Sequence, residues 1–262
     1  MPLQKYPRTP HLRHSRLQAG DEGLEVVDFS AIAGRPLVVE EKVDGANAGV
    51  SFDPDGGLLL QSRGHFLAGG PRERHFSPFK AWASGLRQTL WERIGTRYVV
   101  YGEWLYAKHT IFYDALPAWF LEFDVLDRST GRFLATDRRR DLLAGLAIES
   151  VPVLHRGTID DPASLLALLG RSTFKSADWR GALDRAAAIP PHRGTTVADQ
   201  TDPSDLMEGL YVKIEEGGAV TARYKFVRQD FLSRVADSES HWLDRPILPN
   251  GLRLTVGGEP DA

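Results

Sequence analysis

The amino-acid sequence predicts an α+β fold in which antiparallel strands dominate, and three stretches carry this prediction. Two β-rich runs on either side of Asp44-Gly45 indicate a hairpin, because that dipeptide is a strong short-range signal for a tight turn. Residues 207–228 indicate two further strands around a Gly-Gly turn. Residues 79–94 carry apolar side chains at a four-residue spacing, which is typical of an amphipathic helix packed on a sheet.

Composition sets bounds on the class of protein. The 262 residues are 42% hydrophobic, enough for one large domain or two small ones. The chain has no cysteine, which excludes disulfide-linked partners, thiolate nucleophiles and cysteine zinc sites. No apolar run is long enough to span a bilayer, and residues 1–20 lack the apolar core of a signal peptide. We therefore expect a cytoplasmic protein without a membrane partner.

The N-terminal segment, residues 1–29, is basic although the net charge of the chain is −3. Four cations precede the first acid, Asp21, and they are Lys5, Arg8, Arg13 and Arg16. Prolines at 2, 7 and 10 argue against a continuous helix. One interpretation is a solvated, partly ordered arm; the other is an arm that holds a polynucleotide backbone or borders a nucleotide pocket. His11 and His14 have a metal-ligand spacing, but no third ligand lies in sequence range.

Lys42-Val43-Asp44-Gly45 has the spacing K-x-D-G, with which nucleotidyltransferases place a lysine against the α-phosphate of a nucleoside triphosphate. An amine nucleophile is needed because a phosphoramidate leaves an AMP that a later acceptor displaces. A free lysine has a pKa of about 10.4, so nearby cations, a metal or desolvation must lower it. A plain hairpin turn is the alternative interpretation of the motif.

Further strands are predicted at 58–64, where the run ends in a turn, at 98–106 and at 119–126. The second strand contains Glu103 in an aromatic setting, and a carboxylate there has to be paired, bound to a ligand or exposed at the strand end. Arg63 lies at the end of the first of these strands, where its planar guanidinium suits a ribose or phosphate contact. A surface arginine is the alternative.

The remaining segments are predicted more briefly. A basic loop at 69–74 carries Arg72 and Arg74, and a polar and aromatic loop at 107–114 has no role that the sequence fixes. Beyond them we expect a helix at 136–147, an edge strand at 151–154, helical structure at 162–189 and a polar connection at 190–205.

The last predicted strand, 220–228, places Arg223 and Lys225 on one face. Two cations on one face are unusual for a buried strand, and an anion opposite them is the economical explanation. A solvent-facing edge protected by its charges is the alternative.

In this order the motifs resemble those of the covalent nucleotidyltransferase superfamily of polynucleotide ligases and capping enzymes. They are most similar to the RNA ligase branch related to the bacteriophage enzyme that seals nicks in duplex RNA. The resemblance runs from about Val38 to Arg228. It rests on Lys42-x-Asp44-Gly45, Ser62-Arg63, Gly102-Glu103, Phe123-Asp124, Glu208-Gly209-x-x-x-Lys213 and Arg223-x-Lys225. Arg223 departs from the family, which often has lysine there, but a guanidinium is still a cation.

The resemblance implies a role for each residue of the nucleotide site. Lys42 attacks the α-phosphate to give lysyl-AMP. The base is held by Glu41, which accepts from the adenine amino group, and by Phe123, which stacks on the ring. Glu103 meets the ribose hydroxyls, with Arg63 near the ribose or the acceptor phosphate.

The remaining implied roles concern charge. Lys213 and Lys225 neutralise the α-phosphate and lower the pKa of Lys42. Hydrated Mg²⁺ or Mn²⁺ is held through water by Asp44, Glu103 and Glu208. The implied catalytic residues are thus Lys42, Asp44, Glu208, Lys213 and Lys225, and the implied nucleic-acid contacts are Arg63, Arg72, Arg74 and Arg223.

We therefore expect an ATP-dependent RNA ligase that joins 5′-phosphate and 3′-hydroxyl RNA ends in RNA repair. The expected fold is an α+β nucleotidyltransferase (adenylation) domain with antiparallel sheets flanked by helices around an ATP cleft. This domain spans residues 30–235 with a helical insert at about 160–190, and residues 236–262 form a short tail. Only 37 residues follow Lys225 (262 − 225), too few for the oligonucleotide-binding (OB) domain of related DNA ligases and capping enzymes.

Three alternatives stay open: a DNA nick ligase, a GTP-dependent capping-type enzyme and a non-catalytic nucleotide-binding protein. An end-processing kinase or phosphatase partner is expected to supply RNA affinity. The sequence leaves the form of the acceptor end and the oligomeric state undetermined.

Overall fold

The sheet that organises this protein is built from short strands scattered along the chain. The computed structural model describes residues 2–17, 21, 23–190, 194–231 and 247–253. Its strands are β1 (His11–Leu12), β2 (Val26–Val27), β3 (Leu37–Lys42), β4 (Ala46–Phe52), β5 (Leu58–Ser62), β6 (Tyr98–Trp104), β7 (Phe120–Asp127), β8 (Arg132–Leu134), β9 (Glu149–Ser150), β10 (Val153–Gly157), β11 (Gly209–Glu216) and β12 (Ala219–Val227). Its helices are η1 (Phe29–Ala31), η2 (Pro71–Phe76), α1 (Ser77–Gly85), α2 (Arg87–Ile94), α3 (Thr136–Leu143), α4 (Pro162–Leu166), α5 (Trp179–Ala187) and α6 (Gly194–Asp199).

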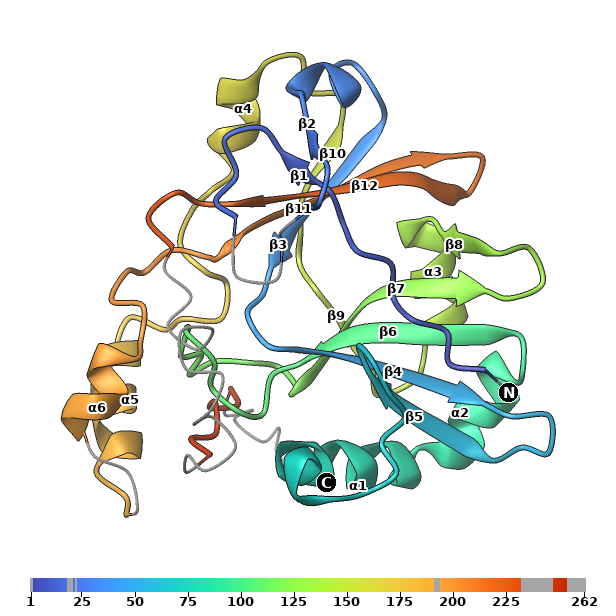
Figure 1. Ribbon diagram of the computed structural model, residues 1–262, viewed down its shortest axis with the longest axis horizontal. Coiled ribbons are helices and arrows are strands. Elements are labelled where there is room, and N and C mark those ends of the chain that lie inside the picture. Colours follow the sequence, from blue (N-terminus) through green and yellow to red (C-terminus); the bar gives the residue numbers. More distant parts are fainter. Residues whose placement is uncertain (1, 18–20, 22, 191–193, 232–246, 254–262) are drawn as a thin grey trace, which may run out of the picture.

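These strands join in one sheet whose main path is β10-β3-β11-β12-β8-β7-β6-β4-β5. Figure 1 shows β3, β11 and β12 in the upper part of the molecule and β4, β6 and β7 in the lower part. All pairs along this path are antiparallel. The α+β class and the antiparallel arrangement predicted from the sequence are therefore confirmed, although hydrogen bonding links the strands into one sheet rather than several.

The predicted hairpin around Asp44-Gly45 is wrong. β3 pairs with β10 and β11, whereas β4 pairs with β5 and β6, so Val43 to Gly45 cross from the upper to the lower half of the sheet. Gly45 is required by close approach, because a Cβ there would lie 2.6 Å from Leu105 and 2.8 Å from the Trp104 carbonyl oxygen. The motif lysine thus ends one half of the sheet just before the chain enters the other.

The second predicted hairpin is confirmed. β11 and β12 pair along their length, and the turn is formed by Gly217 and Gly218, whose φ angles of 60° and 76° favour glycine. β5, β6 and β7 also lie where strands were predicted, and β10 is the edge strand of the path.

Two helix predictions need correction. The helix predicted at 79–94 is divided into α1 and α2 near Gly85 and Leu86, since glycine is a poor helix former. The stretch 162–189 holds only the short helices α4 and α5. Residues 167–178 between them are not helical, and Arg171 forms a β-bridge with Leu206 instead.

Alternation along β3 assigns each side chain to one of two faces. Leu37, Val39 and Glu41 share the face that packs in a core with Leu210, Val212 and Phe226. Val38, Glu40 and Lys42 lie on the other face, together with Tyr211, Lys213, Arg223 and Lys225 by register. This second face, called the polar face below, therefore collects four of the cations that the sequence singled out, namely Lys42, Lys213, Arg223 and Lys225.

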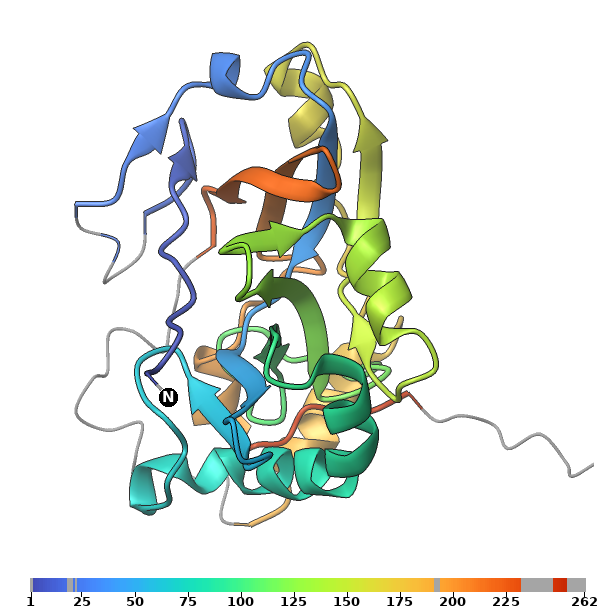
Figure 2. The ribbon, with the colours of Figure 1, turned by 90° about the vertical axis from the view of Figure 1, so that its right-hand side faces the viewer.

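The N-terminal arm packs along the polar face rather than extending into solvent. Figure 2 shows it running from the lower half of the sheet to the upper half. At its start, the carbonyl oxygen of Gln4 accepts hydrogen bonds from Gln61 of β5 and Tyr101 of β6. Further on, β1 pairs in parallel with β12 and β2. The arm therefore bridges the two halves of the sheet.

The predicted tail 236–262 falls mostly outside the described residues. Within it, Asn250 is buried and its side chain bonds to the backbone of Leu105 and Tyr113, so residues 247–253 pack against the domain. No helix in the described ranges has both the length and the apolar character needed to cross a bilayer.

Candidate active site

Lys42 lies among carboxylates at the end of β3. Its Nζ is 2.5 Å from Oε2 of Glu208, the residue just before β11. Burial alone would lower the pKa of Lys42, but Glu208, Glu103 and Asp44 together outweigh it and the pKa is raised. The lysine is therefore held as an ammonium ion.

This direction is opposite to the one expected from the sequence. Lys213 and Lys225 were expected to lower the pKa of Lys42, yet both have carboxylate partners of their own. The negative charges nearest Lys42 decide its protonation. A site that uses Lys42 as a nucleophile must first weaken its attraction to these carboxylates.

Asp44 is fixed by the loop at 107–114, for which the sequence suggested no role. The Asp44 carboxylate accepts hydrogen bonds from the backbone amides of Thr110 at 2.7 Å and Ile111 at 2.8 Å. The Asp44 amide donates to the Tyr113 hydroxyl at 2.8 Å, and His109 Nδ1 lies 4.0 Å from the carboxylate. The loop thus holds the Asp44 carboxylate at a place where its charge raises the pKa of Lys42.

Glu103 faces the same site from β6. Burial raises its pKa to about 8, and the charges of Glu208 and Asp44 add to the rise while Lys42 opposes it. Asn47 lies opposite Glu103 across the β4–β6 pair, and its buried Oδ1 makes no hydrogen bond to any residue that the structure describes. The sequence analysis did not single out Asn47.

The carboxylates of Asp44, Glu103 and Glu208 fit a divalent cation held through water. Burial is the main cause of the raised pKa of Glu103, and the charges of Glu208 and Asp44 add to it, so a cation beside these acids would favour the ionised form of Glu103. In the part of the chain that the structure describes, no three His, Asp or Glu side chains converge as direct metal ligands. A hydrated ion, which keeps several of its waters, needs no such set.

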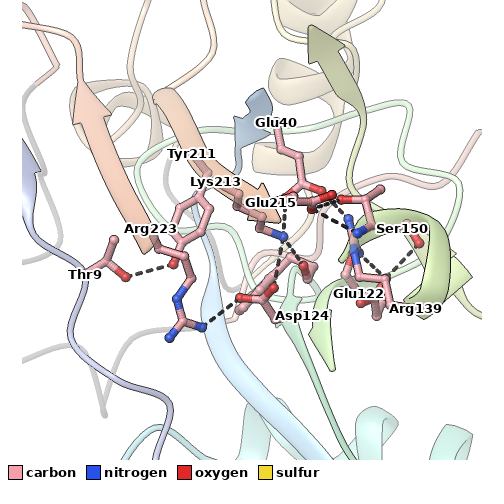
Figure 3. A network of polar contacts seen from close by, with 12 residues as sticks. Thr9, Glu40, Glu122, Asp124, Arg139, Ser150, Tyr211, Lys213, Glu215 and Arg223 are labelled. Atoms are coloured by element: carbon pink, nitrogen blue, oxygen red, sulfur yellow. Dashed lines mark hydrogen bonds and ion pairs between the residues drawn. The ribbon is translucent and has the colours of Figure 1, made fainter. Parts of the chain in front are cut away.

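Lys213 lies in a buried charge network on the polar face (Figure 3). Its ammonium is 2.8 Å from Glu40 and 3.0 Å from Asp124, it donates to the Phe123 carbonyl oxygen, and its side chain is 0% exposed. Glu40 also pairs with Arg139 of α3. In this structure the charge of Lys213 is therefore compensated by the protein.

The network ends at both sides in further ion pairs. Arg139 binds Glu122 as well as Glu40, and Arg223 binds Asp124 at 3.1 Å, with its guanidinium carbon 3.8 Å from the centre of the Phe133 ring. The network contains three acids, Glu40, Glu122 and Asp124, and three bases, Arg139, Lys213 and Arg223, so their numbers balance. Such balance is needed where charges leave water.

Glu41 and Phe123, the expected adenine contacts, differ in burial and in their surroundings. Glu41 is buried on the face of β3 opposite to Lys42, and it accepts hydrogen bonds from Ser172 Oγ at 2.5 Å and the Thr173 amide at 3.0 Å. Burial raises its pKa despite these bonds. Phe123 is half-buried, with the Tyr6 ring 5.1 Å away, edge to face.

The expected nucleic-acid contacts are spread out. Arg63 directly follows β5 and Arg74 lies in η2, and both are exposed. The Arg72 side chain lies outside the described residues. A cavity of about 290 Å³ lies between the N-terminal arm and β12, lined by Arg8, Thr9, Pro10, Glu25, Val27 and residues 220–224. Arg223 thus borders this cavity, and Lys42 does not.

Comparison with solved structures finds chains that are similar to this one. Two similar solved structures are of Naegleria gruberi RNA ligase. A mutant with ATP and Mn has 18% identity and a TM-score of 0.48, covering 76% of this chain and 51% of that one. The form with PPi has 20% identity and a TM-score of 0.48, covering 81% and 53%. This chain therefore spans about half the length of those proteins.

A search of curated protein sequences finds no match. A family model described as RNA ligase matches residues 35–227. That match includes β3 with Lys42, the carboxylates around it and the hairpin of β11 and β12. Because it covers most of the chain, the protein belongs to the RNA ligase family.

Proposed function

We propose that this protein is an ATP-dependent RNA ligase of the nucleotidyltransferase fold. It joins a 5′-phosphate and a 3′-hydroxyl RNA end through lysyl-AMP and an adenylylated RNA end. The observation that carries the proposal is the position of Lys42, the lysine of K-x-D-G, among Glu208, Glu103 and Asp44 inside the family match. We place the reaction in cytoplasmic RNA repair, with an end-processing kinase or phosphatase as partner.

In the first step, Lys42 Nζ attacks the α-phosphorus of ATP. A P–N bond forms, the bond from the α-phosphorus to the bridging oxygen breaks, and pyrophosphate leaves with the electron pair. Glu208 Oε2, 2.5 Å from Nζ, is placed to receive the first proton, which converts the Lys42 ammonium to the attacking amine. The second proton, lost from nitrogen as the P–N bond forms, leaves with the pyrophosphate. Bound Mg²⁺ or Mn²⁺, held through water by Asp44, Glu103 and Glu208, supplies positive charge that offsets the phosphates.

Two further steps complete the proposed reaction. The 5′-phosphate of an RNA end attacks the phosphorus of lysyl-AMP, which frees Lys42 and leaves AMP on the RNA end. A 3′-hydroxyl then attacks the 5′-phosphate, loses its proton and displaces AMP. Arg63, Arg72, Arg74 and Arg223 are the proposed contacts to the RNA, since arginine suits bidentate phosphate binding.

The nucleotide is proposed to lie on the polar face, between the two halves of the sheet. Phe123 stacks on adenine, and Glu103 and Arg63 meet the ribose. Lys225 contacts the α-phosphate together with Lys213, which must loosen its contacts with Glu40 and Asp124 to do so. A contact between the Glu41 carboxylate and the adenine amino group likewise requires its bonds to Ser172 and Thr173 to open.

Intact-protein mass spectrometry tests the first step. Incubation with ATP and Mg²⁺ or Mn²⁺ should add one AMP, and peptide mapping should place it on Lys42. Lys42→Ala should abolish the adduct, whereas Lys80→Ala, which removes a half-buried lysine paired with Glu73, should retain it. An adduct undiminished in Lys42→Ala would falsify the proposal. Defined RNA and DNA ends, assayed side by side for sealing, identify the acceptor.

A further inference from the structure

A chain of four side chains links the N-terminal arm to the polar face. Ser15 Oγ lies 2.6 Å from His11 Nδ1, and His11 Nε2 lies 2.9 Å from Asp21 Oδ2. The other oxygen of Asp21 lies 2.8 Å from Nζ of Lys225. The His11 side chain is 0% exposed, and those of Asp21 and Lys225 are 9% and 13% exposed, so these hydrogen-bonded side chains are largely shielded from water.

The hydrogen bonds along this series of side chains are compatible with a definite tautomer of His11. Ser15 Oγ accepts the backbone N–H of Val227 at 2.9 Å, so its own hydroxyl proton is available to donate to His11 Nδ1. His11 Nε2 then carries the proton and donates to Asp21. With this tautomer both ring nitrogens of His11 are hydrogen-bonded, and Asp21 Oδ1 is left for Lys225.

Backbone pairing holds the same elements together. His11 of β1 lies opposite Lys225 of β12, and the Lys225 amide donates to the Pro10 carbonyl oxygen at 2.9 Å. The N-terminal arm thus binds both the main chain and the side chain of Lys225. Lys42 in turn lies close enough to Lys225 for its charge to lower the pKa of Lys225, after the larger effect of burial.

A lysine that acts on a phosphate benefits from such restraint. Its four-carbon stem is flexible, and fixing the ammonium before the reaction removes an entropic cost from the transition state. An ammonium has three N–H donors, so a bond to Asp21 leaves two for an anion. The interpretation of His11 and His14 as paired metal ligands is not supported, because His11 is buried and bonded to Ser15 and Asp21 while His14 is exposed.

We propose that His11 and Asp21 are positioning residues that orient the ammonium of Lys225 toward the α-phosphate. The N-terminal arm thereby completes the nucleotide site. This inference rests on the proposed function of Lys42. His11 sets the orientation of the Asp21 carboxylate, Asp21 sets that of Lys225, and neither residue needs to touch the nucleotide.

The test measures single-turnover lysyl-AMP formation over a range of ATP concentrations, with each variant assayed well below its melting temperature. His11→Leu and Asp21→Asn should lower the maximal rate by about tenfold or more, the size expected for a residue that orients a catalytic group. The ATP concentration for half-maximal rate should change much less. His11→Gln, which keeps an N–H donor near the position of Nε2, should recover most of the lost rate.

The control on the same arm is His14→Asn, because His14 is exposed and asparagine tolerates its φ of 67°. It should leave the rate unchanged. The decisive comparison adds His11→Leu to Lys225→Ala. If His11 acts through Lys225, the double variant is no slower than Lys225→Ala alone, whereas a general structural role makes the losses multiply.

Failures of the two proposals are distinguishable. Normal adduct formation in His11→Leu, no rescue by His11→Gln, or multiplying losses in the double variant overturns this inference alone. Absence of the adduct in the wild-type protein overturns the proposed function and this inference with it.

Discussion

Replacing Lys213 by methionine tests whether its ammonium holds buried charges together. Lys213 lies between Glu40 and Asp124, and all three side chains are 0% exposed. Methionine has a similar length, so Lys213→Met removes the charge while leaving little cavity. Two carboxylates in a water-free site then lose a shared cation, and breaking such a buried pair costs about 3–5 kcal/mol.

This loss of unfolding free energy corresponds to a decrease in melting temperature. At about 2.1 cal/mol/K per residue, the unfolding entropy of the 262-residue chain is about 0.55 kcal/mol/K. A loss of 3–5 kcal/mol should therefore lower Tm by about 5–9 °C, measured by scanning calorimetry at pH 8.

The loss of stability in Lys213→Met, called the deficit below, should also depend on pH. Burial raises the pKa of Glu40, while Arg139 and Lys213 act against the rise, so removing Lys213 moves this pKa further up. A carboxyl whose folded-state pKa exceeds its unfolded value stabilises the protein in its protonated form and loses that contribution as the pH rises. The deficit of Lys213→Met should therefore be largest at pH 8 and smaller at pH 5.

The matched control removes an exposed cation. Arg35 lies 2.7 Å from Glu216, and their side chains are 46% and 43% exposed. Such surface pairs contribute about 0–1 kcal/mol, so Arg35→Met should lower Tm by no more than about 2 °C. Equal losses for Lys213→Met and Arg35→Met at pH 8 would refute the reasoning, and a deficit that does not vary with pH would refute the part assigned to Glu40.

Three further predictions concern the proposed reaction. At limiting Mn²⁺, adenylation should increase as the pH rises through about 8. Burial and the neighbouring acids raise the pKa of Glu103 to about 8, so its carboxylate charge appears only above that pH. Glu103→Gln should lack this increase, and identical pH profiles for the variant and the wild-type protein would contradict the assignment of Glu103. Glu41→Gln should weaken the preference for ATP over GTP in a competition for adduct formation, and an unchanged preference excludes an adenine contact by the Glu41 carboxylate. Sealing of RNA ends should fall steeply between about 50 and 200 mM salt, while lysyl-AMP formation from a small triphosphate falls much less. Efficient sealing at the higher salt concentration without a partner protein would refute RNA binding by mainly electrostatic contacts.

Some of the site could be predicted from the sequence because strand periodicity is local. A period of two places Glu40 and Lys42 on one face of β3, and Arg223 and Lys225 on one face of β12, whatever lies beside them. The Gly217-Gly218 turn likewise depends only on adjacent residues. Such local features are enough to predict which side chains of one strand share a face of the sheet.

Other parts could not be predicted, because they depend on residues distant in sequence. Asp44-Gly45 suits a hairpin turn as well as a crossing between half-sheets, and only the pairing of β3 with β10 and β11 selects the crossing. Glu41 looked available for a base, but Ser172 and Thr173 occupy its carboxylate. No short-range pattern connects such partners.

The sequence by itself determined the α+β class, the K-x-D-G motif with Lys42 and the charged residues that we propose for a nucleotide site. The tertiary structure decided how their charges are paired: Lys42 with Glu208, Lys213 with Glu40 and Asp124, and Lys225 with Asp21. The physical reason is that a strand's pattern follows from its own backbone, whereas a pKa or an ion pair depends on distance in space and on burial.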